Sequence, residues 1–221
     1  MEKISKTAML KLISDLRNLA PNRPLSYGES LQVARLQAAR MRKALGVNSP
    51  EINLRWLIGQ KAVPVHFVPS HELNEDSGLT TDLIDERLQI FINEGEPPIR
   101  QRFSLLHELK HVLDFPHAKT LHMRLGSGDS ERKAQMIEWI ANDFAAHALM
   151  PTPLVKRIWH RTQDVRLAAS FFDVSTEAMT TRLTKLGIIG ERKPLPRTYF
   201  RQVGLAGSTG NDPIGLVECT A

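Results

Sequence analysis

The chain has 221 residues, of which 42% are hydrophobic and 24% charged, as is typical of a globular protein that folds around its own core. Its net charge of +5 permits an acidic or nucleic-acid partner without requiring one, and no apolar run approaches the roughly 20 residues that cross a bilayer. The single cysteine, Cys219, excludes a disulfide framework, so we expect a cytoplasmic protein.

Helical spacing dominates the first 50 residues, and we predict that residues 1–50 form an N-terminal helical segment. Apolar residues recur every three or four positions over residues 4–19 and again over residues 26–45, on either side of a break between Pro21 and Pro24. Charged residues interrupt the apolar ones from the first positions onward, so a helix and not a secretion signal is expected there. The tripeptide Asn48-Ser49-Pro50 predicts a boundary.

The period then changes, and residues 51–190 are predicted to form an α+β domain. Pro64 predicts an edge or strand-start position for the first of its strands, and the last two strands flank Asp85-Glu86 as a hairpin, so a small, mostly antiparallel sheet is expected. Residues 191–221, rich in Pro and Gly, predict a poorly ordered tail. The expected strands are 62–68, 78–84 and 87–93, and the expected helices are 54–60, 100–114, 130–149, 152–160 and two short ones ending near residue 186.

The stretch FSLLHELKHVLDFPH, residues 103–117, carries the clearest chemical signal. On a helix, His107, Glu108 and His111 lie opposite an apolar face. Histidines at i and i+4 place both rings on one side, which suits two ligands of a tetrahedral Zn²⁺, while Glu108 can reach a water as a general base. A surface helix with two solvated histidines is the alternative interpretation. The apolar face consists of Leu105, Leu106, Leu109, Val112 and Leu113.

Two residues compete to be the third ligand. His117 follows His111 by six residues, the spacing of metzincins, but Asp114 stands where metzincins place the glycine that lets the chain turn back to the metal. Glu138 lies 27 residues after His111 in the strongly helical stretch EWIANDFAAHALMP. Asn142 projects from the same side one turn later, so one rigid helix would supply both a ligand and a polar group to support the site. This pairing favours Glu138.

These two stretches resemble the ImmA/IrrE family of metallo-endopeptidases, which show an R-F-x-L-x-H-E-L-x-H block and an E-x-x-A-[ND]-x-F-A-A-x-L-[ML]-P block. The resemblance covers about residues 26–188. One departure is Asp114, where many members have histidine. The matching residues are Arg102, Phe103, His107, Glu108 and His111 in the first block, and Glu138, Ala141, Asn142, Phe144, Ala145, Ala146, Leu149, Met150 and Pro151 in the second.

The resemblance implies a zincin-like fold in which His107, His111 and Glu138 bind Zn²⁺ and Glu108 is the catalytic base. It also implies a protein substrate, namely a helix-turn-helix repressor of a mobile element, a stress response or a toxin–antitoxin pair. Asn142 and Asp114 are expected to support the ligands from outside. An exposed sheet edge could hold the substrate as an added strand. Three residues are candidates for a second oxyanion donor, none of them by spacing: His122, His147 and Tyr199.

Residues 164–187 resemble a helix-turn-helix, with Ser175 as the expected N-cap of the second helix. The leading turn of that helix carries Thr176 and Glu177 where a DNA-reading helix usually carries basic residues, which favours a supporting helix pair over direct nucleic-acid binding. Two other functions stay open. One is a non-catalytic, zinc-stabilised module that sequesters a repressor or binds DNA, and it would not need Glu108. The other is a metal hydrolase that acts on a small amide.

Overall fold

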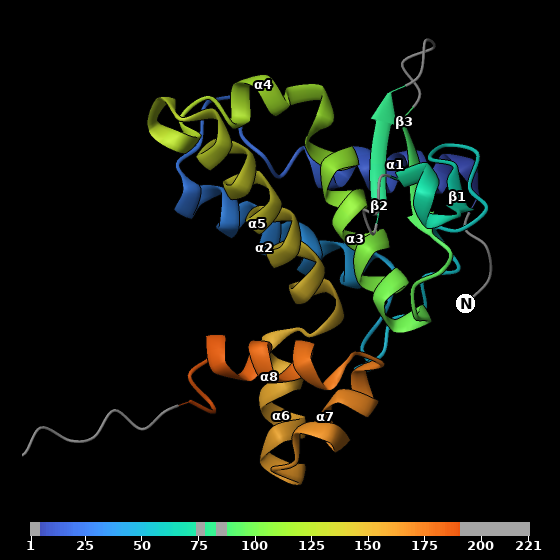
Figure 1. Cartoon of the computed structure of the whole chain (residues 1–221), viewed down its shortest axis with the longest axis vertical. Helices are drawn as coiled ribbons and strands as arrows, with labels where there is room; N and C mark the ends of the chain where they lie inside the picture. Colours follow the sequence, from blue (N-terminus) through green and yellow to red (C-terminus); the bar gives the residue numbers. More distant parts are fainter. Residues whose placement is uncertain (1–4, 74–77, 83–87, 191–221) are drawn as a thin grey trace, which may run out of the picture. The chain divides into compact units, whose positions relative to one another are not determined.

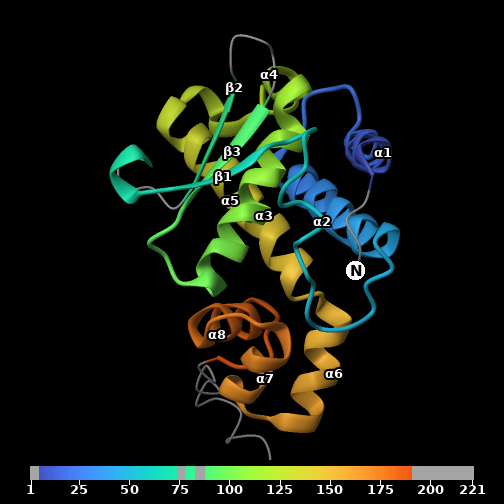
Figure 2. The same cartoon turned by 90° about the vertical axis from the view of Figure 1, so that its right-hand side faces the viewer.

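The computed structural model describes residues 5–73, 78–82 and 88–190, and those up to Ile189 form one compact unit. Helix α3 lies between a three-stranded sheet and helix α5, and α2 packs along α5 (Figures 1 and 2). The longer helices are α1 (Lys6–Arg17), α2 (Tyr27–Ala44), α3 (Pro98–Asp114), α5 (Ser130–Leu149), α6 (Thr152–Thr162), α7 (Val165–Phe172) and α8 (Thr176–Lys185). Short helical turns are η1 (Ser70–Leu73), η2 (Phe115–His117), α4 (Ala118–Leu121) and η3 (Leu125–Gly128).

The sheet has the order β1 (Val65–Val68), β3 (Leu88–Asn93), β2 (Gly78–Asp82). Strand β2 pairs with β3 antiparallel, and β1 pairs with β3 parallel. The predicted α+β class with a small sheet packed on α3 is confirmed, but the expected mostly antiparallel pairing is wrong for β1. Strand β3 turns back from β2 and so runs beside β1 in the same direction, a non-local pairing that a hairpin signal cannot reveal.

Local signals explain where several elements begin and end. Helix α2 begins at a capping box in which the Ser26 hydroxyl accepts a hydrogen bond from the Glu29 amide and the Glu29 carboxylate accepts one from the Ser26 amide. Pro64 precedes β1, which lies at a sheet edge as predicted. The helix expected at residues 54–60 is wrong. A single turn forms there, and Gly59, with φ of +78°, ends it.

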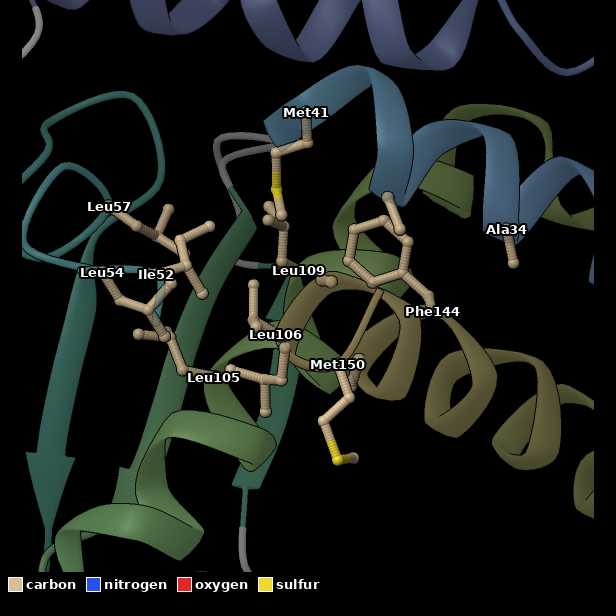
Figure 3. Packing of buried hydrophobic residues seen from close by; sticks show 14 of the residues in the cluster. Ala34, Met41, Ile52, Leu54, Leu57, Leu105, Leu106, Leu109, Phe144 and Met150 are labelled. Carbon is tan, nitrogen blue, oxygen red and sulfur yellow. The ribbon is translucent and has the colours of Figure 1, made fainter. Parts of the chain in front are cut away.

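The core fixes α3 and α5 side by side. Leu105, Leu106 and Leu109 of α3 share one core cluster with Phe144 of α5 and Met41 of α2, and each of the five is at most 2% exposed (Figure 3). Burying such side chains stabilises the fold by roughly 1.5–3 kcal/mol each. All five apolar residues predicted for α3 are buried, so the opposite side of this helix is the one left for polar residues.

The chain after α5 forms the expected helix pair, α7 and α8. Asp173 adopts a left-handed conformation between them, and Ser175 caps α8 by accepting a hydrogen bond from the Ala178 amide, as predicted. No described helix is long and apolar enough to cross a membrane. The division of the chain into segments 1–50, 51–190 and 191–221 stays a prediction. The Asp85-Glu86 turn and Tyr199 lie outside the described residues.

Candidate metal site

Three side chains from two helices meet where α3 crosses α5. His107 Nε2 lies 3.0 Å from Glu138 Oε2 and 3.1 Å from His111 Nε2. His111 Nε2 lies 3.5 Å from Glu138 Oε1. Among the residues that the structure describes, these are the three whose His, Cys, Asp or Glu ligand atoms lie close enough to hold one metal ion. His117, the competing third ligand, lies in the turn η2 and is not part of this group.

The spacing of the three ligand atoms fits a tetrahedral metal ion. Zinc–nitrogen and zinc–oxygen bonds of about 2.0–2.2 Å imply distances of about 3.3–3.6 Å between neighbouring ligands of a regular tetrahedron. The observed separations run from 3.0 to 3.5 Å. Two imidazoles and one carboxylate are a ligand set that catalytic zinc sites use, with the fourth position open to water or substrate.

Asn142 contacts the first histidine from outside this group of three. It lies one turn after Glu138 on α5, and its side-chain Oδ1 is 2.9 Å from His107 Nδ1. In this arrangement Nδ1 carries the proton and donates it to the amide oxygen, which leaves the lone pair of Nε2 directed at the metal position. The amide therefore selects the tautomer that can act as a ligand.

The electrostatics of the three groups also suit a cation. Burial opposes the charged form of His107, but the hydrogen bond to Glu138 and the charges of Glu108 and Glu138 outweigh it, so the pKa of His107 is raised. Burial, followed by the charge of His107, lowers the pKa of His111 to about 4. The hydrogen bond from His107 lowers the pKa of Glu138 despite its burial. In the metal-free site these interactions favour the protonated form of His107 and the ionised form of Glu138, and a metal cation would take the place of that proton.

Glu108 lies against the edge strand β2. Glu108 is a buried residue, 6% exposed. Gly78 of β2 lies so close to it that a Cβ added to this glycine would be 3.1 Å from Glu108 Cγ and Oε1. Such a Cβ would also lie 3.3 Å from Ile92 Cδ1, so a larger residue could not fit without displacing its neighbours. Sequence reasoning missed Gly78, although a glycine in a strand can signal such a close approach.

Asp114 points into a second cluster on α3. Its Oδ1 is 2.5 Å from Lys110 Nζ, and its Oδ2 is 3.3 Å from His122 Nε2. Burial opposes ionisation of Asp114, but the charge of Lys110 and the hydrogen bonds from His122 and Lys110 lower its pKa overall. The negative charge of Asp114 acts to raise the pKa of His111. Its support of the metal site stays a prediction.

The other sequence candidates lie elsewhere. His122 is bound to Asp114, and His147 Nδ1 lies 2.8 Å from the backbone oxygen of Asp143. Arg102, one of the motif residues, pairs through Nε with Asp173 Oδ2 at 3.1 Å and so joins α3 to the turn between α7 and α8. A second oxyanion donor therefore stays unassigned.

Comparisons with known proteins agree with this geometry. A model of the peptidase M78 family, described as the IrrE N-terminal-like domain, matches residues 60–184. The chain is 30% identical over 110 residues to the radiation response metalloprotease IrrE of Deinococcus radiodurans. This match covers 50% of this chain and 33% of that protein. The matched part thus spans about a third of that relative.

A solved structure shares the fold. A transcriptional regulator from Mycobacterium tuberculosis superposes with a TM-score of 0.56 at 16% sequence identity. The superposition covers 78% of this chain and 51% of the regulator, so the likeness extends beyond the metal site to most of the described helices.

Proposed function

Since the chain belongs to the IrrE N-terminal-like family of metallopeptidases, we propose that it is a zinc-dependent endopeptidase. One observation carries the proposal: His107, His111 and Glu138 converge on one point while Glu108, from the same turn of α3, lies against an edge strand. A module that only binds zinc for stability would not need that glutamate.

The side chains divide the work of peptide hydrolysis between them. His107, His111 and Glu138 would hold the metal, and Asn142 keeps His107 in the required tautomer. Bound Zn²⁺ supplies a Lewis acid that makes water a nucleophile near neutral pH and polarises a carbonyl group. Glu108 accepts the proton of the attacking water and passes it to the nitrogen of the leaving amine.

The edge strand offers a way to present the substrate. Strand β2 pairs with β3 on one side and forms the outer edge of the sheet on the other. An extended segment that adds to this edge would run past Gly78 and bring its carbonyl group close to Glu108. Folded domains cannot add in this way, so the enzyme should cut flexible segments and leave folded proteins intact.

The substrate that the family resemblance favours is a helix-turn-helix repressor in the cytoplasm. Cleavage within a flexible segment would separate its DNA-binding part from its oligomerising part. Helix α8 supports this reading over direct DNA binding, because its first turn carries Thr176 and Glu177 where a DNA-reading helix usually carries basic residues. The role of the α7–α8 pair is then to support α5 and α3.

The test is co-expression with a helix-turn-helix repressor from the same genome. We expect one discrete cut, which the change Glu108→Gln reduces by about 10²–10⁴-fold because the amide cannot accept the proton. The variant should keep its fold and one metal ion per chain. Glu177→Gln, which changes an exposed glutamate on α8, is the matched control and should cut normally. A repressor that is bound but never cut, or full activity in Glu108→Gln, would support sequestration in place of catalysis.

A further inference from the structure

A pocket of about 750 Å³ lies beside the candidate metal site, between α2, α5 and α8. It shares Asn142 with that site, so the two are separated by a single turn of α5. Apart from Asn142, no residue that lines the pocket has a role in the proposed chemistry. Its lining combines an apolar rim with several charged groups.

Two aromatic residues form much of the rim. The rings of Tyr27 and Trp139 meet edge to face, with centroids 6.3 Å apart and planes at 64°. Trp139 directly follows the ligand Glu138 and is 46% exposed, although tryptophan is usually well covered. Leu31 and Leu186 complete the apolar lining. A side chain of an extended peptide could pack on this surface.

The charges in the pocket do not balance. Asp143 is its one carboxylate, and Arg35 already neutralises it through an Nε–Oδ2 contact of 2.8 Å. His147 is neutral at pH 7, because burial and then the charge of Arg182 lower its pKa. The charge of Asp143 also acts on Arg182, but with Arg182 and Lys185 added to Arg35 the cations of the pocket outnumber its one carboxylate.

Arg182 is the more unusual of these two cations. The residue is 4% exposed, and its partners are neutral: Nε donates to the Met150 backbone oxygen at 3.1 Å and Nη2 donates to Thr152 Oγ1 at 3.0 Å. Burying a guanidinium group without an anion costs free energy. Among the described residues no carboxylate lies within ion-pair distance of Arg182 or of Lys185, so within this part of the chain the pocket wall offers cations without a paired anion.

We propose that this pocket binds an aspartate or glutamate side chain of the extended substrate segment, between Arg182 and Lys185, with a neighbouring apolar side chain on Trp139. The assignment rests on the proposed function for its meaning, since a peptide that leaves the metal site along α5 passes Trp139 and enters the pocket. Specificity would then require an acidic residue at a fixed distance to one side of the scissile bond.

A binding measurement tests the pocket without requiring catalysis. Capped hexaglutamate and capped hexaglutamine are titrated into the zinc-loaded protein, and tryptophan emission is followed with Trp139→Phe as the check that the signal arises in the pocket. Hexaglutamate should bind at least about tenfold more tightly, because a hydrogen bond between a cation and a carboxylate is stronger than one to a neutral amide. Lys185→Glu should remove that preference.

Lys156→Glu is the matched control, since it changes the net charge equally at an exposed position on α6, outside the pocket lining. It should leave the preference unchanged. Equal loss in both variants would show attraction to a basic protein in general and would overturn the proposal, as would equal binding of the two peptides.

A cleavage measurement then connects the pocket to the reaction. A mixture of capped random octapeptides is digested, and the products are sequenced by mass spectrometry. Acidic residues should be enriched at one position in wild type and depleted there in Lys185→Glu. Binding of hexaglutamate without any cleavage would count against the peptidase proposal and leave the anion pocket standing. Cleavage without an acidic preference would overturn the pocket's role in specificity.

Discussion

Helix α3 carries two clusters of histidine and carboxylate that differ in how their charges are balanced. The first consists of His107, His111 and Glu138 and stays accessible, with the Glu138 side chain 54% exposed. The second consists of Lys110, Asp114 and His122, whose side chains are all at most 8% exposed. Histidines and carboxylates in proximity therefore do not identify a metal site by themselves.

The second cluster supplies its own cation. Lys110 Nζ lies against Asp114 as a metal ion might, and His122 binds the other carboxylate oxygen. The first cluster has no lysine or arginine among its three members, while the charges of Glu138 and neighbouring Glu108 both act on His107. What distinguishes a site ready for a metal is thus uncompensated negative charge together with access from solvent.

Replacing Glu138, the carboxylate of the first cluster, should have the largest effect. Glu138→Ala leaves two imidazoles, which hold Zn²⁺ far less well than a three-ligand set, so bound metal should fall from one per chain toward zero. His117→Ala should keep its metal, because His117 is outside the group. Metal content by mass spectrometry of the native protein separates the two variants. The reverse pattern would restore the metzincin-like assignment.

Removing Asp114 from the second cluster should instead lower the free energy of unfolding. Asp114→Asn leaves Lys110 charged and buried without its partner, which should lower the free energy of unfolding by about 3–5 kcal/mol while one metal per chain is retained. Chemical denaturation of the metal-free protein measures the loss. The double change Lys110→Met with Asp114→Leu removes both charges and should recover most of it. Loss of metal in Asp114→Asn would show that the two clusters are coupled.

The same cluster predicts a pH dependence of stability. The pKa of Asp114 is lower in the folded protein than its usual value, so its stabilisation is fully present above the unfolded pKa of about 3.9 and is lost as the pH falls through the folded pKa. Asp114→Asn should lack this component of acid unfolding. An unchanged acid-unfolding profile in the variant would mean that other carboxylates dominate.

The contrast between the clusters also shows what the sequence could and could not predict. His107, Glu108 and His111 share one side of α3 because the apolar residues of this helix place the opposite side in the core. The spacing of the apolar residues and the spacing of the polar ones are both visible in the sequence. Glu138 could be anticipated from its helix and its motif. The local signals at Ser26, Pro64 and Ser175 likewise placed helix starts and a sheet edge correctly.

What sequence reasoning missed depends on distant contacts. The partnership of Lys110 with Asp114 was visible as an i, i+4 pair, but His122 reaches them only after the chain turns through η2 and α4. The parallel pairing of β1 with β3 and the approach of Gly78 to Glu108 likewise join segments that no local pattern connects. The helix predicted at residues 54–60 is wrong for a local reason, because Gly59, with its positive φ, ends the segment after a single turn.

The smallest effects are expected from Asn142 beside the first cluster and from His122 in the second. Asn142 holds His107 as His122 holds Asp114, each through one hydrogen bond to the inner group. Asn142→Ala should weaken metal affinity about 10–100-fold, since His107 loses the partner that fixes its tautomer. Competition with a chelator of known affinity measures the change.

His122→Ala is the corresponding change in the second cluster, where the partner of His122 is the buried Asp114. It should lower the free energy of unfolding by about 1–3 kcal/mol and leave metal affinity unchanged, since it deprives a buried carboxylate of a donor. Asn142→Asp, which keeps an acceptor for His107 Nδ1, should restore most of the affinity that alanine loses. If alanine and aspartate at position 142 behave alike, the hydrogen bond does not orient the ligand. If His122→Ala loses metal while Asn142→Ala does not, the functional assignment of the two clusters must be exchanged.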